Sequence, residues 1–338
     1  MAKIELSREA YFHNLDIIAQ KVGDISKIAV VLKDNAYGHG LLEMAALSKA
    51  YGLSQAVVHN TTEAAMIKSY FTEILILGGH YYICDPHYCY VINTREQIVS
   101  MPKGLKVELK VDTGMHRNGV AMDEVHEALR ELTEAGLELQ GVMTHHRSAD
   151  TLSSEYFWQR ENFAKVKEEV RGLQKHLGFG ALRFHAANSA ATFRSEQCED
   201  DLVRVGIAAY GCLEMARTLP QPELRPVLTL KAEKIATRKI AKGAHVGYNA
   251  TFRAKEEMVV STYDVGYADG LLRSASNHYM TPEGAELLGR ISMDNSSFSG
   301  QCRELVIFDD VNTFAKAAGT IGYEVLTGLH PEIERVIV

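Results

Sequence analysis

The sequence predicts an α/β protein with an N-terminal (β/α)8 barrel and a C-terminal, mostly β domain. Three observations predict this fold class. Eight short apolar runs alternate with helical patterns between residues 27 and 211. Prolines at 220, 222 and 226 interrupt that alternation, and strand-like runs follow them. The 338 residues exceed one ordinary compact unit but suit a large barrel plus a smaller domain. We therefore expect domains at 1–220 and 221–338.

The eight runs have the character of buried parallel strands, because they are apolar, rich in β-branched residues and followed by polar residues or glycine. They are "KIAVVLK", "LSQAVVHN", "TEILILGG", "HYCYVIN", "LKVELKVDTG", "LQGVMTHH", "ALRFHAANS" and "LVRVGIAAYG". A doubly wound open sheet is the alternative, since it shows the same alternation of strands and helices. In either fold, residues just beyond the carboxyl ends of the strands are the catalytic candidates.

Helical and second-domain elements follow from the spacing of apolar residues. One apolar face runs from Tyr156 to Leu177, and Gly178 ends that helix. The segment "MDEVHEALRELTEAG" predicts a second helix. Beyond the prolines, we expect strands in "VLTLKAEKIATRKI", "EMVVSTYDVG", "ELLGRISMD" and "ELVIFDDV", and helix near "NTFAKAAGTIGYEVLTG".

Composition excludes several functional classes. The net charge is -7 without a dense Lys/Arg block, so we expect no nucleic-acid partner and no anionic membrane partner. The apolar runs are strand-sized, and the first residues lack the apolar core of a signal peptide, which favours a cytoplasmic location. The five cysteines are irregularly spaced, so we expect free thiols and no metal site.

Polar residues collect at the predicted carboxyl rim of the strands. They are Lys33, Tyr37, Arg117, His145, Asn188, Ser189, Arg204 and Gly206. A buried lysine in an apolar, partly cationic setting has a lowered pKa and can attack a carbonyl. Hydroxyls and the backbone N–H groups near Gly206 suit a phosphate. An amine beside a phosphate cradle indicates pyridoxal 5'-phosphate (PLP) bonded to Lys33.

Nine segments, in order, resemble the alanine racemase family of PLP enzymes over nearly the whole chain. They are "VVLKDNAYGHG", "LKVDTGMHRNGV", "MTHHRSAD", "FHAANSAAT", "LVRVGIAAYG", "VGYNATF", "VGYADG", "GRISMD" and "GYEVLTG". The resemblance implies a PLP-dependent racemase that interconverts L-alanine and D-alanine in the cytoplasm, for cell-wall synthesis. It also implies a head-to-tail homodimer with shared active sites. The first residues, "KIELS", would pair with the second domain.

The resemblance also implies roles for individual residues. Lys33 would bond the cofactor and act as the base for D-alanine, and Tyr248 of the partner subunit would be the base for L-alanine. Two opposed bases suit racemisation, since a single base returns the proton mostly to the face it came from. Arg204 would face the pyridine nitrogen, and His145 would tune Tyr248 and Arg204.

The remaining implied residues bind rather than react. The cofactor set comprises Lys33, Tyr37, His145, Asn188, Ser189, Arg204, Gly206, Ile207 and Tyr323. The substrate set comprises Arg117, Met293, Asp294 and Tyr267, with Asp150 near the entrance. In some family members the lysine that matches Lys110 is carbamylated and braces the arginine that matches Arg117.

Departures from the family pattern keep other functions open. Asp34 replaces a small residue, while His146 and Arg147 replace an apolar or aromatic residue and a small one. They favour a shifted specificity, for serine or another amino acid, as the first alternative. A non-catalytic PLP-binding barrel is the second, although the C-terminal domain argues against it. A decarboxylase of the same fold type is the third, and Arg204 argues against it, because that chemistry requires an acidic partner at the pyridine nitrogen.

Overall fold

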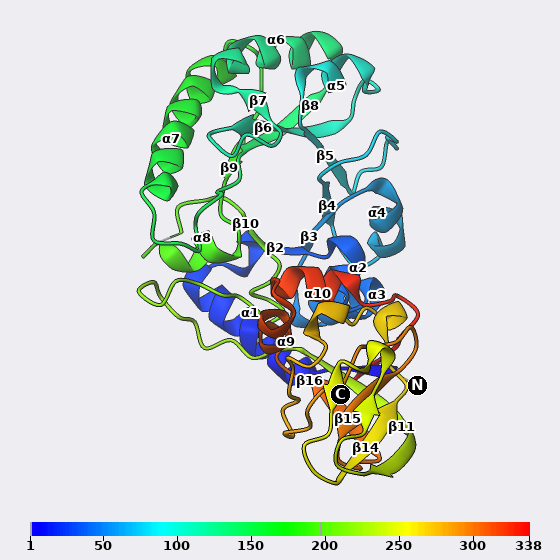
Figure 1. Ribbon diagram of the computed structural model, residues 1–338. Helices are drawn as coiled ribbons and strands as arrows, with labels where there is room; N and C mark the ends of the chain where they lie inside the picture. The colour runs from blue at the N-terminus through cyan, green and yellow to red at the C-terminus, as the bar shows by residue number, and fades with distance from the viewer. Residues whose placement is uncertain (1, 197) are drawn as a thin grey trace.

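Eight parallel strands surrounded by helices make up the N-terminal part of the computed structural model, which describes residues 2–196 and 198–338 (Figure 1). The strand order is β10-β2-β3-β4-β5-β6-β8-β9. The strands are β2 (Ile28–Val31), β3 (Gln55–Val58), β4 (Glu73–Ile76), β5 (Tyr88–Ile92), β6 (Lys106–Asp112), β8 (Glu138–Met143), β9 (Arg183–His185) and β10 (Val203–Val205), with the short β7 (Val120–Ala121) beside β6. All eight predicted strands are therefore present.

Helices and short helical turns connect the strands and lie around the ring. They are α1 (Arg8–Val22), α2 (Lys33–Tyr37), α3 (Leu41–Tyr51), α4 (Thr61–Ile67), α5 (Arg95–Ser100), α6 (Val125–Ala135), α7 (Glu155–Gln174) and α8 (Ser189–Arg194), with 3-10 turns η1 (Ile25–Lys27) and η2 (Met122–Glu124). Both helices predicted from apolar spacing, α6 and α7, are present, but α7 ends at Gln174 and not at the predicted Gly178, because residues 175–178 continue as turns. Gly136 ends α6 in a left-handed conformation.

The ring is a nearly closed barrel rather than a doubly wound sheet. The ring closes between β9 and β10. There Asn188, which follows β9, forms a parallel bridge with Arg204 in β10. The Arg204 N–H donates to the Ala187 carbonyl at 3.0 Å. The predicted barrel is thus confirmed, and its closing seam lies beside two of the candidate site residues.

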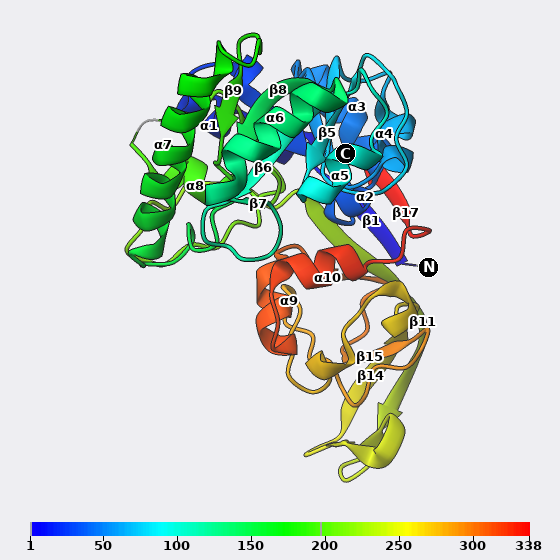
Figure 2. The ribbon, with the colours of Figure 1, turned by 90° about the horizontal axis from the view of Figure 1, so that it is seen from above.

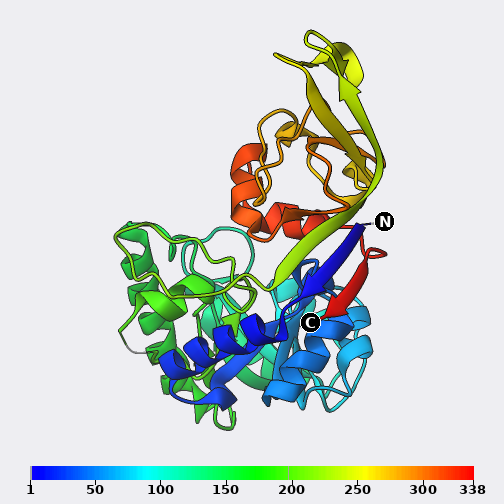
Figure 3. The same ribbon diagram turned by 90° about the horizontal axis from the view of Figure 1, so that it is seen from below.

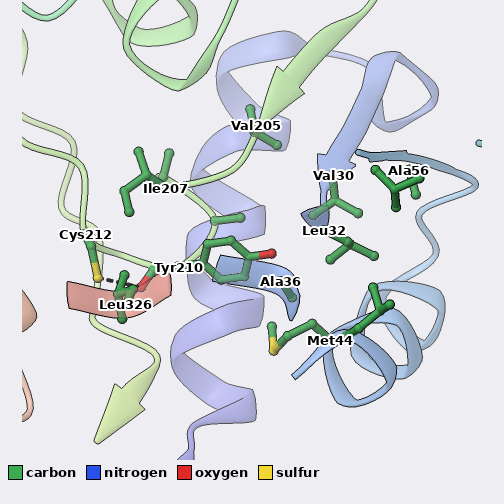
Figure 4. Close-up of a cluster of buried hydrophobic side chains, with 14 of the residues drawn as sticks. Val30, Leu32, Ala36, Met44, Ala56, Val205, Ile207, Tyr210, Cys212 and Leu326 are labelled. Atoms are coloured by element: carbon green, nitrogen blue, oxygen red, sulfur yellow. Dashed lines mark hydrogen bonds between the residues drawn. The ribbon is translucent and has the colours of Figure 1, made fainter. Parts of the chain in front are cut away.

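Alternate residues of the strands pack on opposite sides of the barrel wall. One side faces the helices, where Val30, Leu32, Met44 and Tyr210 form part of the main core (Figure 4). The Tyr210 hydroxyl donates to the carbonyl of Val31 at 2.8 Å, which fixes the Tyr210 side chain against β2. Burial of such side chains contributes roughly 1.5–3 kcal/mol each. The other side of the wall faces the barrel interior, where a smaller apolar cluster lies: Ala29, Val31, Val57, Leu75, Cys89, Val91, Met143 and Leu202.

The C-terminal domain is built on a sheet that the chain's first strand joins. The sheet order is β15-β14-β11-β1-β17, with β16 also paired to β11. Its strands are β1 (Ala2–Leu6), β11 (Leu228–Ile240), β14 (Met258–Tyr263), β15 (Ser296–Ser299), β16 (Glu304–Phe308) and β17 (Glu334–Ile337). Strand β1 runs antiparallel to β11, with Ile4 opposite Leu230. Figures 2 and 3 show the domain projecting from the barrel along the long β11.

Short elements complete this domain. They are β12 (His245–Val246), η3 (Tyr248–Ala250), β13 (Phe252–Arg253), η4 (Tyr267–Asp269), η5 (Arg273–Ala275), α9 (Val311–Ala318) and α10 (Gly322–Gly328). The helices predicted near the C-terminus are present. Helix α10 returns to the barrel and contacts α2 (Figure 2).

One predicted strand, in "ELLGRISMD", is wrong. This described stretch has two isolated bridges, Met280–Glu286 and Leu287–Phe298, and then turns at Gly289. Gly289 has φ +72, and a Cβ there would lie 2.4 Å from the Val246 carbonyl oxygen. Strand β15 takes the place beside β14 instead, because its alternation buries Phe298 completely.

Candidate active site

A cavity of about 1110 Å³ opens at the carboxyl end of the barrel strands. It collects most of the predicted site residues from segments far apart in the sequence. They are Lys33, Tyr37, Lys110, Arg117, His145, Asp150, Asn188, Ser189, Arg204, Gly206, Ile207 and Tyr323. The departures from the family pattern, Asp34, His146 and Arg147, line it as well.

The Lys33 amine is presented by an unusual left-handed turn directly after β2. Asp34, Asn35, Ala36 and Tyr37 all have φ between 52 and 55°. Left-handed backbone costs about 1–2 kcal/mol per non-glycine residue. The surroundings must therefore hold it.

Several hydrogen bonds hold this turn. The Asp34 N–H donates to Glu63 Oε1 at 2.7 Å, and Asn35 Oδ1 accepts from the Leu41 N–H at 2.9 Å. The Arg335 guanidinium donates to the Gly38 carbonyl at 2.9–3.0 Å. The turn therefore aims two functional groups, the Lys33 amine and the Tyr37 ring, into one cavity.

The expectation of a buried Lys33 needs correction. Its side chain is 33% exposed, and Nζ pairs with Asp34 Oδ2 at 2.5 Å. The amine therefore lines the cavity in a partly exposed position. Asp34 thus places a carboxylate directly beside the Lys33 amine, and the sequence analysis did not predict this contact.

One end of the cavity gathers hydroxyl and backbone N–H groups from Ser189, Gly206, Tyr37 and Tyr323. The Ser189 hydroxyl accepts the N–H groups of Gly206 and Ala208 at 3.1 and 3.2 Å. A Cβ on Gly206 would lie 2.8 Å from the Tyr37 hydroxyl, so only glycine leaves that space free. The Tyr37 ring lies 5.9 Å from that of Tyr323 on α10.

Arg204 lies deeper in the cavity, where burial lowers the pKa of its guanidinium to about 10. It therefore stays charged near neutral pH. Nη2 donates to the carbonyls of Thr144 and Ala186 at 2.8 and 3.2 Å, and Nη1 bonds to His185 Nδ1. Within the described residues, the Arg204 guanidinium donates only through Nη1 and Nη2, which leaves Nε for a ligand.

Lys110, Arg117 and Arg204 make this part of the cavity wall cationic, and His145 lies among them. Burial, Arg204 and Arg117 lower the pKa of His145 well below its ordinary value, so its ring is neutral. Burial, Arg117 and Arg204 lower the pKa of Lys110 to about 8. The relation between His145 and Arg204 in this structure is thus electrostatic, since the Arg204 hydrogen bond to a histidine goes to His185.

The candidate residues of the second domain lie elsewhere in the same chain. Tyr248, Tyr267 and Met293 line a separate depression of about 410 Å³ with Arg273 and Ile291. The three are 63%, 43% and 55% exposed. Asp294 lines a further depression beside β1 and is apart from both. A single chain therefore does not bring Tyr248 to Lys33.

Residues 2–196 and 198–338 contain neither a membrane-spanning helix nor a metal cluster. None of their helices has both the length and the apolar character needed to span a bilayer. No group of three or more His, Cys, Asp or Glu side chains there is arranged to hold a metal ion.

Comparison with known proteins decides the family. The family described as "Alanine racemase, N-terminal domain" matches residues 6–214, and "Alanine racemase, C-terminal domain" matches residues 227–337. This chain belongs to the alanine racemase family. It is accordingly an enzyme, an isomerase, as predicted.

Individual alanine racemases match this chain from end to end. It is 44% identical to the alanine racemase of a Nitratiruptor species, with 99% of each chain covered. Identity to that of Campylobacter concisus is 40%, again with 99% of each covered. Among solved structures, that of the Acinetobacter baumannii alanine racemase has a TM-score of 0.84 at 27% identity, covering 100% of this chain and 99% of that one. The Bacillus anthracis alanine racemase with bound L-Ala-P has a TM-score of 0.87 at 27% identity, covering 100% and 95%.

Three polar residues behind the cavity, two of them fully buried and Arg183 partly exposed, were not among the residues predicted from the sequence. They are Glu108, Arg183 and His185. A signal was present: in "VELK" and "LRFH", charged or polar residues alternate with apolar ones inside strands that were predicted to be buried on both faces. Such alternation indicates polar side chains that point into the barrel.

Proposed function

We propose that this enzyme is a PLP-dependent alanine racemase with two bases, Lys33 and Tyr248 of the partner subunit. One observation carries the proposal: a single cavity presents an amine, a cradle of hydroxyl and backbone N–H groups, and a buried arginine. The relatives that are 40–44% identical over 99% of the chain are named alanine racemases, which supports alanine as the substrate.

The residues present fit PLP. Lys33 supplies the amine for the cofactor's aldehyde. The Ser189, Tyr37 and Tyr323 hydroxyls and the N–H groups of Gly206, which here donates to Ser189, and Ile207 suit its phosphate. Gly206 has no Cβ to meet the Tyr37 hydroxyl, so the Gly206 backbone and the Tyr37 hydroxyl can lie close together. Arg204 Nε is left to face the pyridine nitrogen. The cofactor, when bound, withdraws electrons from the amino acid's Cα and so makes its proton removable.

Arg204 also sets how strong that withdrawal is. A guanidinium with a pKa of about 10 keeps its proton at neutral pH, so a pyridine nitrogen placed beside it would stay unprotonated. The withdrawal would then be moderate, and Arg204 would favour return of the proton to Cα over transamination. The same argument opposes the decarboxylase alternative.

The two bases serve opposite faces of Cα. We propose that Lys33 takes the proton of D-alanine and that Tyr248 takes that of L-alanine, each returning a proton on its own side. Tyr248 is 63% exposed in its own chain, as a residue that completes another chain's site must be. His145 is held neutral and is proposed to orient Tyr248.

Substrate binding is proposed to rest on Arg117 and the backbone near Met293, with Asp294 and Tyr267 at the entrance. Arg117 stands in the cationic part of the cavity, beside Lys110, which suits a carboxylate. Arg147 is a weaker candidate for carboxylate binding, because it pairs with Glu155 and donates to the Gly114 carbonyl at 2.7 Å. We propose that it braces the loop before Arg117 instead.

A racemase of shifted specificity remains the second candidate, since Asp34 places a carboxylate beside the reactive amine. The non-catalytic barrel is disfavoured, because the C-terminal family match covers residues 227–337. We further propose that the enzyme works as a homodimer in the cytoplasm and supplies D-alanine to the cell wall.

One experiment tests the central assignment. The purified enzyme, incubated with PLP and then borohydride, should carry the reduced cofactor on Lys33, as peptide mass spectrometry shows. It should also convert L-alanine into the racemate and leave L-serine nearly unchanged. A label on another lysine would refute the cofactor site, and faster turnover of L-serine would favour the second candidate.

A further inference from the structure

A line of charged and polar side chains, buried at Arg204, His185 and Glu108 and partly exposed at Arg183 and Glu73, crosses the interior of the barrel behind Arg204. From Arg204 it passes to His185, whose Nε2 lies 2.8 Å from Glu108 Oε2. The other Glu108 oxygen pairs with Arg183, and Arg183 pairs with Glu73 at the start of β4. His185 and Glu108 are completely buried. The line therefore connects the cavity with the opposite end of the barrel.

The alternation of side chains places these groups inside the ring. In β9, Arg183 and His185 flank Phe184, which belongs to the outer core. In β6, Glu108 lies between Val107 and Leu109, which also pack outward. An apolar cluster fills another part of the interior, so the polar line lies beside apolar side chains.

The contact between β6 and β9 depends on a missing side chain in the strand between them. Strand β8 separates the two, and Gly141 pairs with both Glu108 and Arg183. A Cβ on Gly141 would lie 2.7 Å from Arg183 Cγ and 3.1 Å from Glu108 Oε1. The glycine thus leaves the gap through which the two side chains meet.

The donors and acceptors of this line fix one tautomer of His185. Arginine can only donate, so Nδ1, which faces Arg204, must be unprotonated. An ionised carboxylate can only accept, so Nε2, which faces Glu108, must carry the proton. Burial lowers the pKa of His185, and His185 and Arg183 together hold the pKa of Glu108 at about 2 despite its burial, so both are in the required state.

We propose that Glu108 is a positioning residue for Arg204: by holding His185 in its Nε2–H tautomer, it aims the guanidinium into the cavity. A largely buried ion pair such as Glu108–Arg183 does not by itself raise the free energy of unfolding, since apolar residues of similar size can pack equally well in its place. His185 can accept a hydrogen bond from Arg204 at a fixed position only if its ring is oriented, however, and the Glu108 carboxylate orients it. The orientation of Arg204 does not depend on the proposed function. The effect of that orientation on a bound pyridine ring, by contrast, rests on the proposed function.

The state of His185 is measured first on the full chain without added cofactor. Imidazole nitrogens are labelled with 15N, and long-range proton–nitrogen spectra are assigned by comparison with His185→Leu. A neutral ring protonated at Nε2 is expected. A charged ring, or one protonated at Nδ1, would overturn the proposal whether or not the protein binds PLP.

The decisive variant is Glu108→Gln, with Glu73→Gln as the matched control at the far end of the line. In Glu108→Gln, the amide oxygen should accept from Arg183, which leaves the amide NH₂ group facing His185. The ring must then carry its proton on Nδ1, where it opposes the Arg204 donor. Glu73→Gln loses the same charge without touching His185, so its His185 signals should match those of the wild type.

The cofactor-loaded protein supplies the second readout. Glu108→Gln should lower kcat roughly 10- to 100-fold, the usual effect of losing a contact that orients a functional group through a histidine. KM for alanine should change little, and pyruvate formed per racemisation should rise. Equal effects of Glu108→Gln and Glu73→Gln on these quantities would show a merely structural role and overturn the proposal.

If Glu108→Gln does not fold, a second variant still tests the proposal. His185→Leu leaves the Glu108–Arg183 pair in place and removes only the link to Arg204. It should reproduce the fall in kcat and the rise in pyruvate. Wild-type values for His185→Leu would refute the positioning role. If the wild-type protein shows the expected tautomer but takes up no PLP, the proposed function fails and the orientation of Arg204 stands.

Discussion

At the scale of single residues, Tyr248 has the most specific expected behaviour. Tyr248→Phe should slow loss of the L-alanine α-proton by roughly 100-fold or more, because it removes a general base, while D-alanine exchange falls much less. Uptake of solvent deuterium from each enantiomer measures the two rates. Tyr81→Phe, at a site that is 72% exposed, is the control and should change neither. Equal losses for both enantiomers would contradict a face-specific base.

Arg204 is expected to control the reaction's fidelity. In Arg204→Glu, a carboxylic acid partner favours a protonated pyridine nitrogen and a stronger electron sink. Racemisation should slow, and pyruvate released per racemisation should rise by about tenfold or more. Arg204→Lys keeps a cation at the position and should keep the ratio closer to that of the wild type. An unchanged ratio in Arg204→Glu would mean that Arg204 does not contact the ring nitrogen.

We propose that Lys110 is carbamylated, which would give the site a pH dependence of its own. Only the neutral amine attacks CO₂; a nitrogen–carbon bond forms and a proton leaves to solvent. Since its pKa is lowered to about 8, the neutral fraction and hence the carbamate should rise as pH passes upward through 8. NMR with 13C-bicarbonate should show this signal in the wild type and in Lys106→Ala, a control in the same strand. Persistence of the full signal in Lys110→Ala would assign it elsewhere.

At the scale of elements, the left-handed turn of α2 is held against α10. Gly38 has φ +75, and a Cβ there would lie 1.9 Å from the Leu326 carbonyl oxygen. Gly23 has φ +80 with nothing within 4 Å, so it is a matched control. Gly23→Ala should cost about 1–2 kcal/mol of the free energy of unfolding, from backbone strain alone.

Gly38→Ala should cost at least about 1 kcal/mol more than Gly23→Ala, because backbone must also move. It should weaken PLP binding too, since the turn carries Tyr37 and α10 carries Tyr323. Urea unfolding and cofactor titration measure the two effects. Equal unfolding free energies for the two variants would show that α2 and α10 are not tightly packed.

The elements also show what the sequence could and could not predict. The eight barrel strands and the helices α6 and α7 were predictable, because burial on both faces and apolar spacing are local signals. The left-handed turn was not, since Asp34 to Tyr37 are ordinary residues held there by distant ones such as Arg335. Strand β15 was missed because its serines hide the alternation that buries Phe298.

For the candidate site, local motifs predicted most residues that meet in the cavity. They did not predict the Lys33–Asp34 pair or the line from Glu108 to Arg204, because both depend on side-chain directions and on the order of strands around the barrel. Pairing across Gly141 joins residues 75 positions apart in the sequence. Such contacts exist only once the barrel closes.

At the scale of the whole molecule, the relation between the two parts of the chain decides how the site is completed. We propose that residues 1–220 and 221–338 form separate domains, with the first strand joined to the second domain's sheet. The hairpin that carries Tyr248 follows β11 toward the end of the second domain that points away from the barrel (Figure 3). The exposed Tyr248 and Met293 therefore suit contact with another chain better than contact with their own barrel.

A shared site makes a quantitative prediction for mixed dimers. Lys33→Ala and Tyr248→Phe each inactivate every site in their own homodimers. In a mixed dimer, one site receives both lesions and the other receives intact Lys33 from one chain and intact Tyr248 from its partner. Random pairing makes about half of the dimers mixed, so about a quarter of all sites should recover activity. Racemisation is measured after equal amounts are mixed under conditions of subunit exchange.

The control for this experiment is exchange itself, followed with two different affinity tags on the two variants. Mixing Lys33→Ala with differently tagged Lys33→Ala should restore nothing, since every site then lacks the amine. If Lys33 and Tyr248 instead acted within one chain, each site of the mixed dimer would keep one lesion. Complete exchange without any return of activity would then contradict the shared site, and recovery near a quarter would establish that each site is built from two chains.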